Sequence, residues 1–196
     1  MLRLVESIKV QDGVIHNLEH HQERMNLSVY KLTGENNRIF LSDELSVPAE
    51  FSAGIFKCRV VYTDRIELVE FIPYIRRDIR SLKLIHADID YSCKYEDRSG
   101  LNSLFAQRGE CDDILIIKDG LVTDSSSANI AFTDGQLWFT PAKPLLHGTK
   151  RCRLIAEKKL IERDITAAEI KRFTHASIIN AMIDPEEILI RTEFIY

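Results

Sequence analysis

The sequence is poor in cysteine, and the cysteines that it has are scattered. They form no CxxC pair and no Cys/His spacing that could cage a zinc ion. His21, His147 and His175 likewise have no histidine four residues away that would complete a metal site. We therefore predict no metal centre and four reduced thiols, at Cys58, Cys93, Cys111 and Cys152.

Long apolar runs and an excess of one charge are also missing. Near the N-terminus, Arg3, Glu6 and Lys9 interrupt any stretch that could serve as a signal-peptide core or a membrane span. Charged residues make up 29% of the chain but sum to a net charge of only -4. No broad positive field favours nucleic acid or an acidic membrane surface. We expect a cytoplasmic protein without nucleic-acid or membrane partners.

Repeats, low-complexity tracts and sustained heptads are absent, whereas Asp-Gly turns between β-rich runs recur. The hydrophobic content of 45% in 196 residues is enough for the core of one large domain or two small ones. Asp-Gly between strand-like runs is typical of a tight hairpin. The predicted strands and hairpins cover 2–10, 54–63, 66–75, 81–89, 114–124 and 129–140, and the predicted helices cover 18–31, 99–107 and 149–161.

The order of these elements indicates an α+β, mostly antiparallel fold in two lobes. Residues 76–78 are the predicted linker, which divides a small lobe at 1–75 from a larger lobe at 76–196. In the first predicted helix, His20, Arg24 and Ser28 are spaced four apart and share a polar face.

The segment from Asp119 to Arg151 carries the strongest chemical signals. Its SSSAN run lies between two predicted strands, where polar side chains meet unpaired backbone N–H groups. Gly148 then precedes a predicted helix start, and a helix N-terminus that follows glycine is a ready anion site. The SSSAN loop therefore provides polar groups, and the loop that ends at Gly148 provides a candidate phosphate-binding site.

These residues carry a resemblance to a known family. The run VTDSSSANIAFTDGQLWFTPAKPLLHGTKR resembles the signature stretch of class IV aminotransferases, the fold-type IV pyridoxal-phosphate (PLP) enzymes. They include D-amino-acid and branched-chain aminotransferases and aminodeoxychorismate lyase. Upstream, VESIKV and HHQERMNLS resemble the family opening, and downstream IINAM resembles an element of the lyase branch. The matching positions of the signature are Asp124, Asn129, Thr140, Pro141, Gly148 and Arg151.

The resemblance implies PLP as cofactor and a lysine that forms an imine with it. Lys94 fits this role because it lies 30 residues before Asp124, close to the family separation. Once released, such a lysine also shuttles protons. Lys57 and Lys83 lie within predicted strands and are weaker candidates. The alternative for Lys94 is a loop lysine that pairs with Glu96.

The same resemblance implies the residues that would hold the cofactor. Asp124 takes the place of the family glutamate and would keep the ring nitrogen protonated. A guanidinium such as that of Arg24 suits the phosphate because its fork donates parallel bonds. The predicted cofactor-binding residues are Arg24, Asp124, Asn129, Gly148, Thr149, Lys150 and Asn180.

Substrate contacts and departures from the family pattern complete the predicted site. Arg59 either neutralises a substrate carboxylate or pairs within its sheet. The chain begins almost at the family opening, so we expect an N-terminally shortened, D-amino-acid-aminotransferase-like fold. The aromatic residue that the family's N-terminal segment contributes to the pocket would then be absent, or be replaced by the dimer partner or by Tyr30, Tyr62 or Tyr91. The family Leu-Asn element, here Leu101-Asn102, follows Lys94 at a longer distance than usual.

Three functions remain open from the sequence. The first is an aminotransferase that acts on an amino acid or a similar compound. The second is a lyase of the aminodeoxychorismate type. The third is a non-catalytic relative that binds PLP, or nothing, in a structural or regulatory role. By resemblance we also expect a homodimer.

Overall fold

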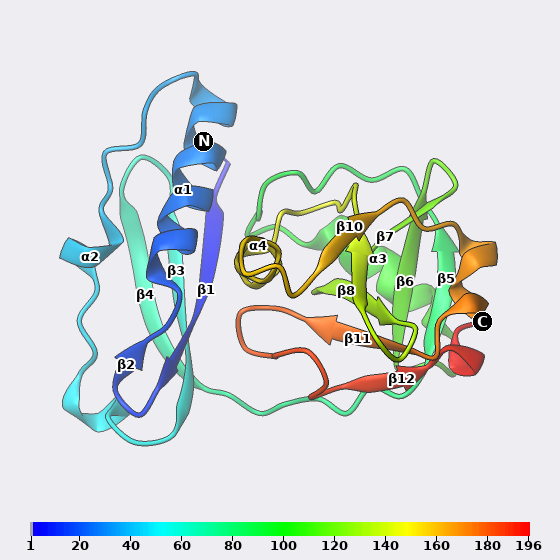
Figure 1. The fold of residues 1–196 in the computed structure, drawn as a ribbon. Coiled ribbons are helices and arrows are strands. Elements are labelled where there is room, and N and C mark those ends of the chain that lie inside the picture. The colour runs from blue at the N-terminus through cyan, green and yellow to red at the C-terminus, as the bar shows by residue number, and fades with distance from the viewer. Residues whose placement is uncertain (1) are drawn as a thin grey trace. The chain divides into compact units, whose positions relative to one another are not determined.

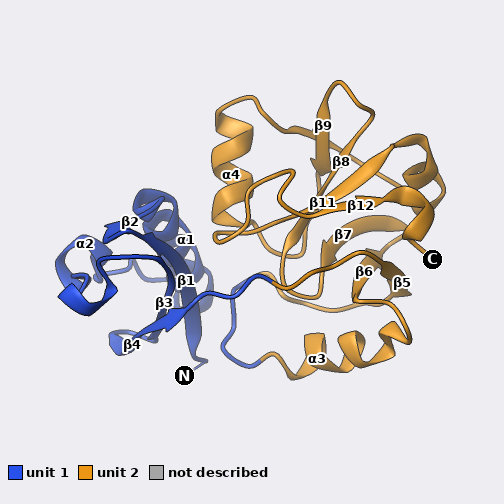
Figure 2. Cartoon of the chain, turned by 90° about the horizontal axis from the view of Figure 1, so that it is seen from below, with its two compact units in different colours: residues 1–76, 93–97 blue, residues 77–92, 98–196 orange. Residues whose placement is uncertain are grey.

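The computed structural model describes residues 2–196, which fold into two compact units (Figure 2). The first unit comprises the chain up to Arg76 together with Cys93–Asp97, and the second comprises Arg77–Ser92 and Arg98–Tyr196. The chain thus returns to the first unit for a short segment that contains Lys94. The predicted division into 1–75 and 76–196 leaves this segment in the larger lobe. A single boundary in the sequence cannot assign it to the first unit, to which it is joined by backbone hydrogen bonds with β1.

The first unit is an antiparallel sheet with helix α1 along one face (Figure 1). The strand order is β2-β1-β3-β4. Its elements are β1 (Leu4–Gln11), β2 (Val14–Ile15), α1 (Leu18–Thr33), α2 (Leu41–Glu44), a 3-10 turn (Ala49–Phe51), β3 (Ile55–Tyr62) and β4 (Ile66–Pro73). The strands and the helix predicted for this region are confirmed within a few residues, whereas α2 was not predicted.

Local turn chemistry explains why the Asp-Gly hairpins form. Asp12 and Gly13 have φ of 49° and 79°, and Asp119 and Gly120 have φ of 51° and 77°. Two consecutive left-handed residues match the type I′ turn, whose twist suits the flanking strands. Glycine and aspartate tolerate this conformation better than most residues.

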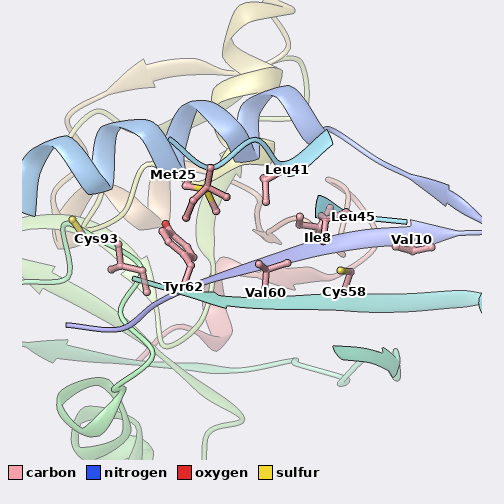
Figure 3. Packing of buried hydrophobic residues seen from close by; sticks show 11 residues of the cluster. Ile8, Val10, Met25, Leu41, Leu45, Cys58, Val60, Tyr62 and Cys93 are labelled. Atoms are coloured by element: carbon pink, nitrogen blue, oxygen red, sulfur yellow. The ribbon is translucent and has the colours of Figure 1, made fainter. Parts of the chain in front are cut away.

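The core of the first unit lies between α1 and the sheet. Alternate residues of β1 point toward the helix, and Ile8 and Val10 are fully buried. Figure 3 shows Met25 of α1 and Tyr62 of β3 in the space between helix and sheet. Cys93 from the returning segment belongs to the same cluster.

The returning segment is held to β1 by backbone hydrogen bonds. The Val5 N–H donates to the Lys94 carbonyl at 2.9 Å, and the Glu96 N–H donates to the Arg3 carbonyl at 2.9 Å. Tyr95 forms an antiparallel bridge beside them. Lys94 is therefore positioned by the sheet of the first unit.

The second unit is built on a larger mixed sheet. Its main strand order is β10-β9-β8-β7-β6-β5, with β11 paired to β8 and β12 paired to β11. Only the pairs β5–β6 and β9–β10 are parallel among the paired strands of residues 77–196. The elements are β5 (Leu82–His86), α3 (Ser99–Phe105), β6 (Asp113–Lys118), β7 (Leu121–Ser125), β8 (Asn129–Thr133), β9 (Trp138–Pro141), α4 (Thr149–Ala156), β10 (Ile161–Arg163), β11 (His175–Ile179) and β12 (Leu189–Arg191), with 3-10 turns at Ala106–Arg108, Ala167–Arg172 and Thr192–Phe194.

The helix predicted over 149–161 is shorter in the structure. It ends at Ala156, and Lys158 then adopts a left-handed conformation with φ of 57°. The Leu160 N–H donates to the Leu154 carbonyl at 3.2 Å, and both side chains enter one apolar cluster. The predicted end is wrong because burial of Leu160 outweighs the local preference of the lysines for helix.

Neither a membrane-spanning helix nor a metal-binding cluster is found in the part of the chain that the structure describes. Among residues 2–196, no helix is both long and apolar enough to cross a bilayer. The same stretch contains no cluster of three or more histidine, cysteine, aspartate or glutamate side chains arranged to hold a metal ion.

Candidate functional site

A buried carboxylate lies at the centre of the first unit. Glu6 on β1 is 0% exposed. It accepts a hydrogen bond from His21 Nδ1 at 2.6 Å and one from Arg24 Nε at 3.0 Å. Arg24 Nη2 also donates to its second oxygen. The guanidinium therefore grips this carboxylate with one edge, in the bidentate manner that suits the two groups.

The charges of this cluster can be assigned from its pKa shifts. Burial alone would raise the pKa of Glu6, but the Arg24 charge and the bonds from His21 and Arg24 hold that pKa at about 2. Burial lowers the pKa of His21 despite the nearby carboxylate. Glu6 is thus ionised and can only accept, so the neutral imidazole carries its proton on Nδ1.

Lys94 and Tyr62 lie close to this cluster. The Lys94 charge contributes to the lowered pKa of His21, which places its ammonium group within electrostatic range. Tyr62 is fully buried, and burial raises the pKa of its hydroxyl; Ser28 hydrogen-bonds it. Among the predicted site residues of the first unit, Arg24 and Lys94 are therefore neighbours of one polar cluster, and Tyr62 stands in the adjoining core.

Glu6 and His21 were not predicted as site residues, although the sequence contains a signal for each. Glu6 lies two residues before Ile8 on β1 and therefore on the same face of the strand as Ile8 and Val10. An acid on this buried face needs a partner. His21 lies four residues before Met25, which places both on the buried face of α1. Read together, the two positions predict a buried acid–base contact.

Arg59 is not part of the Glu6 cluster. The β1–β3 register pairs Glu6 with the residue after Arg59, so the Arg59 side chain projects from the opposite face of the sheet. There it pairs with Glu70 at 2.9 Å and with Glu96 at 2.6 Å, and Arg3 bonds the same Glu96 at 2.8 Å. Pairing within the sheet, one of the two roles left open for Arg59, is what this geometry supports.

A second buried carboxylate lies in the other unit. Asp124 on β7 faces Asn129 at the start of β8, and these two residues are register partners. Asn129 Nδ2 donates to Asp124 Oδ1 at 2.7 Å and to the Leu146 carbonyl at 2.8 Å. The Leu146 N–H donates to Asp124 Oδ2 at 2.9 Å. The loop before α4 is thereby fastened to the carboxylate.

The environment of Asp124 changes its acidity. Burial raises the pKa of Asp124 to about 6, although the bonds from Leu146 and Asn129 and the Arg151 charge act against the rise. Asn129 and the backbone N–H groups of Leu145 and Leu146 already use some of the lone-pair sites of the carboxylate. The remaining sites suit a cationic N–H donor, because an added positive partner would favour the ionised form.

The predicted anion seat lies directly beside Asp124. Gly148 precedes α4, and a Cβ atom built there would stand 2.0 Å from Asn129 Oδ1. Only a residue without a side chain lets the amide and the helix start approach this closely. Thr149, the first residue of α4, is buried as well. Asp124, Asn129 and Gly148 are therefore brought together.

Lys150 and Asn180 are tied into the protein by other contacts. The buried Lys150 ammonium pairs with Asp184, to which Arg153 Nη2 also comes within 3.6 Å. Asn180 Oδ1 accepts the N–H groups of Met182 at 2.9 Å and Ile183 at 3.1 Å. The start of α4 and the loop after β11 are thus joined through Asp184.

Tyr91 lines a cavity within the second unit. The cavity has a volume of ≈ 330 Å³, and its walls include Ser92, Thr123, Lys143 and Leu145. Thr123 precedes Asp124 in the chain, whereas Leu145 precedes the residue that binds it. The cavity therefore adjoins the strand and the loop that hold the buried carboxylate.

Comparison with known proteins identifies the family. A profile described as amino-transferase class IV matches residues 97–184. An uncharacterized protein of Haemophilus influenzae is 40% identical over 185 residues, which cover 93% of this chain and 98% of that protein. A solved structure from Haemophilus somnus, provisionally described as a 4-amino-4-deoxychorismate lyase, is 34% identical with a TM-score of 0.86, and the match covers 93% of this chain and 97% of that one. The chain belongs to the class IV aminotransferase family.

Membership of the class IV family confirms the predicted fold type. A hypothetical aminotransferase of Mycobacterium tuberculosis, solved with PLP bound, matches with a TM-score of 0.77 at 17% identity, over 98% of this chain and 81% of that one. At this identity the likeness concerns the fold alone. The α+β architecture is that of the fold-type IV structures, and the Mycobacterium tuberculosis structure contains PLP.

The side chains of each unit suit a part of PLP. Arg24 offers a guanidinium for a phosphate dianion, and Lys94 offers a primary amine for an aldehyde. Asp124 offers a buried carboxylate for a ring nitrogen, and Thr149 stands at the first turn of an eight-residue helix. The donor set therefore fits the cofactor of the class IV family.

Asp124 makes the free energy of unfolding of the cofactor-free chain depend on pH. Its pKa lies at about 6 in the folded chain, against 3.8 as the usual value. Between about pH 4 and pH 6 the folded chain keeps a proton that the unfolded chain has lost, so the free energy of unfolding falls as pH rises, by up to about 3 kcal/mol. Glu6 acts in the opposite sense and at lower pH, because its stabilising charge is lost as pH falls from 4.5 toward about 2.

We expect Asp124→Asn to remove this decrease in the free energy of unfolding between pH 4 and pH 6. Urea unfolding at intervals between pH 4 and pH 7 measures it, with Asp119→Asn in an exposed turn as the matched control. An unchanged slope in Asp124→Asn would contradict the assignment of the proton to this carboxyl.

Proposed function

We propose that the chain is a PLP-dependent enzyme of the aminotransferase type that acts on an amino acid or a similar amino compound. The observation that carries this proposal is the buried Asp124 carboxylate, held by Asn129 and Leu146 directly before the start of α4. Burial disfavours the ionised form of this carboxylate even with the Arg151 charge nearby, so a ligand that supplies a further positive charge would explain its retention at this position.

Each proposed residue has a defined task. PLP supplies an aldehyde for an amino group and a ring that withdraws electrons from the substrate Cα. Lys94 Nζ would accept the proton from that carbon and return it at the end of the reaction. Asp124 would keep the proton on the ring nitrogen, and Arg24 is the proposed ligand of the phosphate.

A lyase of the 4-amino-4-deoxychorismate type is the second candidate. It is favoured by the 34% identity to the Haemophilus somnus protein over nearly the whole of both chains. Both reactions begin with the same amine condensation and proton removal, so Lys94 and Asp124 would serve either. By family resemblance, we also propose that the protein is a homodimer.

The two candidate functions predict different reactions of the purified protein. Purified protein loaded with PLP is mixed with amino acids one at a time, and the absorbance spectrum is followed for conversion of the cofactor to its pyridoxamine form. In parallel, 4-amino-4-deoxychorismate is supplied and its consumption is measured. The aminotransferase proposal predicts pyridoxamine with at least one amino acid, whereas the lyase predicts consumption without an amino acceptor.

Other outcomes are equally informative. A protein that binds PLP but responds to no donor and consumes no 4-amino-4-deoxychorismate would be a non-catalytic relative. A protein that shows no PLP absorbance would contradict the cofactor itself. Lys57→Ala, which changes a lysine within β3, is the control for effects of lost surface charge.

A further inference from the structure

We infer that Glu6 is a positioning residue for the phosphate of PLP, because its carboxylate fixes the guanidinium of Arg24 in one orientation. This inference rests on the proposed function, in which Arg24 binds that phosphate. Glu6 does not itself contact the cofactor in this scheme. It acts through the arginine.

The geometry of the pair supports this role. Arg24 Nε and Nη2 bond the two oxygens of Glu6, so one edge of the planar guanidinium is engaged. A bidentate contact fixes both the direction and the plane of the group, whereas a single bond would leave it free to rotate. The donors on the remaining part of the guanidinium then point in a defined direction.

His21 completes the arrangement by fixing Glu6. Its Nδ1 donates to the oxygen of Glu6 that also receives Arg24 Nη2. The imidazole is itself 0% exposed and lies on the same helix as the arginine, one turn earlier. The carboxylate is therefore held between two side chains of α1, and β1 and α1 are locked in register at this point.

Burial gives the arrangement its rigidity. Glu6 is 0% exposed and the Arg24 side chain is 11% exposed, so water competes weakly for their hydrogen bonds. A surface arginine would lose side-chain freedom when it binds a phosphate. When the guanidinium is already held, most of this loss of entropy occurs during folding. The phosphate then binds to a preorganised side chain.

Neutralising Glu6 tests the inference. Glu6→Gln keeps the size of the side chain but removes the charge and one of the acceptor oxygens. Dissociation constants are measured for PLP and for pyridoxal, which has the same ring and aldehyde without the phosphate. Glu67→Gln is the matched control, because it breaks another glutamate–arginine pair of the same unit, the Arg3 pair at 2.8 Å.

The expected result is specific to the phosphate. Glu6→Gln should weaken PLP binding by roughly 10- to 100-fold, the range for a lost charged hydrogen bond, and should leave pyridoxal binding nearly unchanged. Glu67→Gln should change neither constant. In addition, Glu6→Gln should have little further effect on PLP binding once Arg24→Ala is present, because Glu6 acts only through that arginine.

Two results would overturn the inference. Equal weakening of PLP and pyridoxal would indicate a general structural role, and additive effects of Glu6→Gln and Arg24→Ala would separate the two residues. If Glu6→Gln does not fold, Glu6→Asp takes its place, since it keeps the charge but withdraws the carboxylate. Failure of the cofactor assignment is distinct, because the wild-type protein would then bind no PLP. A wild-type protein that binds PLP without turnover would refute the proposed activity but leave this binding test valid.

Discussion

Replacing Lys94 with alanine is expected to abolish the covalent attachment of PLP and to lower turnover by about 10²- to 10⁴-fold, the usual contribution of a positioned acid–base group. The lysine amine is the group proposed both to condense with the cofactor and to move the substrate proton. Borohydride reduction followed by peptide mass spectrometry measures the attachment. The wild-type protein should carry a pyridoxyl group on the peptide that contains Lys94, and the variant should carry none.

The fold should survive this substitution. Lys94 is held in place by its own backbone, since its carbonyl accepts the Val5 N–H at 2.9 Å, and alanine keeps that carbonyl. Thermal unfolding of the variant should therefore be close to that of the wild type. Lys83→Ala, on β5, is the matched control. A pyridoxyl group found on another lysine of the wild type would refute the assignment of Lys94.

Introducing a methyl group at Gly148 is expected to disrupt the second unit at its candidate site. The new Cβ of Gly148→Ala would stand 2.0 Å from Asn129 Oδ1, a distance that no relaxed structure tolerates. Either the amide or the start of α4 must move, and both movements break the contacts that hold Asp124. We expect a loss of roughly 1–3 kcal/mol in the free energy of unfolding, as for other overpacked sites. Binding of PLP should weaken with it.

The glycine prediction has an internal control. Gly100→Ala in α3 places a Cβ 3.2 Å from the flexible end of Ile89, so it should cost far less. The cause is tested by Asn129→Ala, which removes the clashing oxygen. Once this change is present, Gly148→Ala should cost less than it does in the wild type, whereas strictly additive costs would show that the clash is not with Asn129.

Local signals in the sequence were enough to predict most of the elements. The hairpins follow from Asp-Gly pairs, because φ preferences act within two residues. The polar cluster of Asp124, Asn129 and Gly148 follows from the family signature, whose members are near one another in the chain. The end of α4 could not be predicted in this way, because it depends on where Leu160 is buried.

Partners distant in the sequence were beyond prediction. The contact of Lys150 with Asp184 spans 34 residues, and the pairing of Arg59 with Glu96 spans 37. Neither has a spacing that a periodic pattern would reveal. The Glu6 cluster could be predicted in part. The alternation of β1 places Glu6 on the buried face, but only the packing of α1 identifies its two partners.

The return of Cys93–Asp97 to the first unit has a consequence for how the protein is made. As the chain leaves the ribosome, the first unit lacks the backbone partner of Val5 until residue 94 has emerged. Since domains tend to fold as units during synthesis, this unit would wait for part of the second one to be translated. A fragment that stops at residue 76 would leave an open sheet edge along β1, a site prone to pairing with other chains. The segment 93–97 therefore makes completion of the first unit depend on synthesis of part of the second.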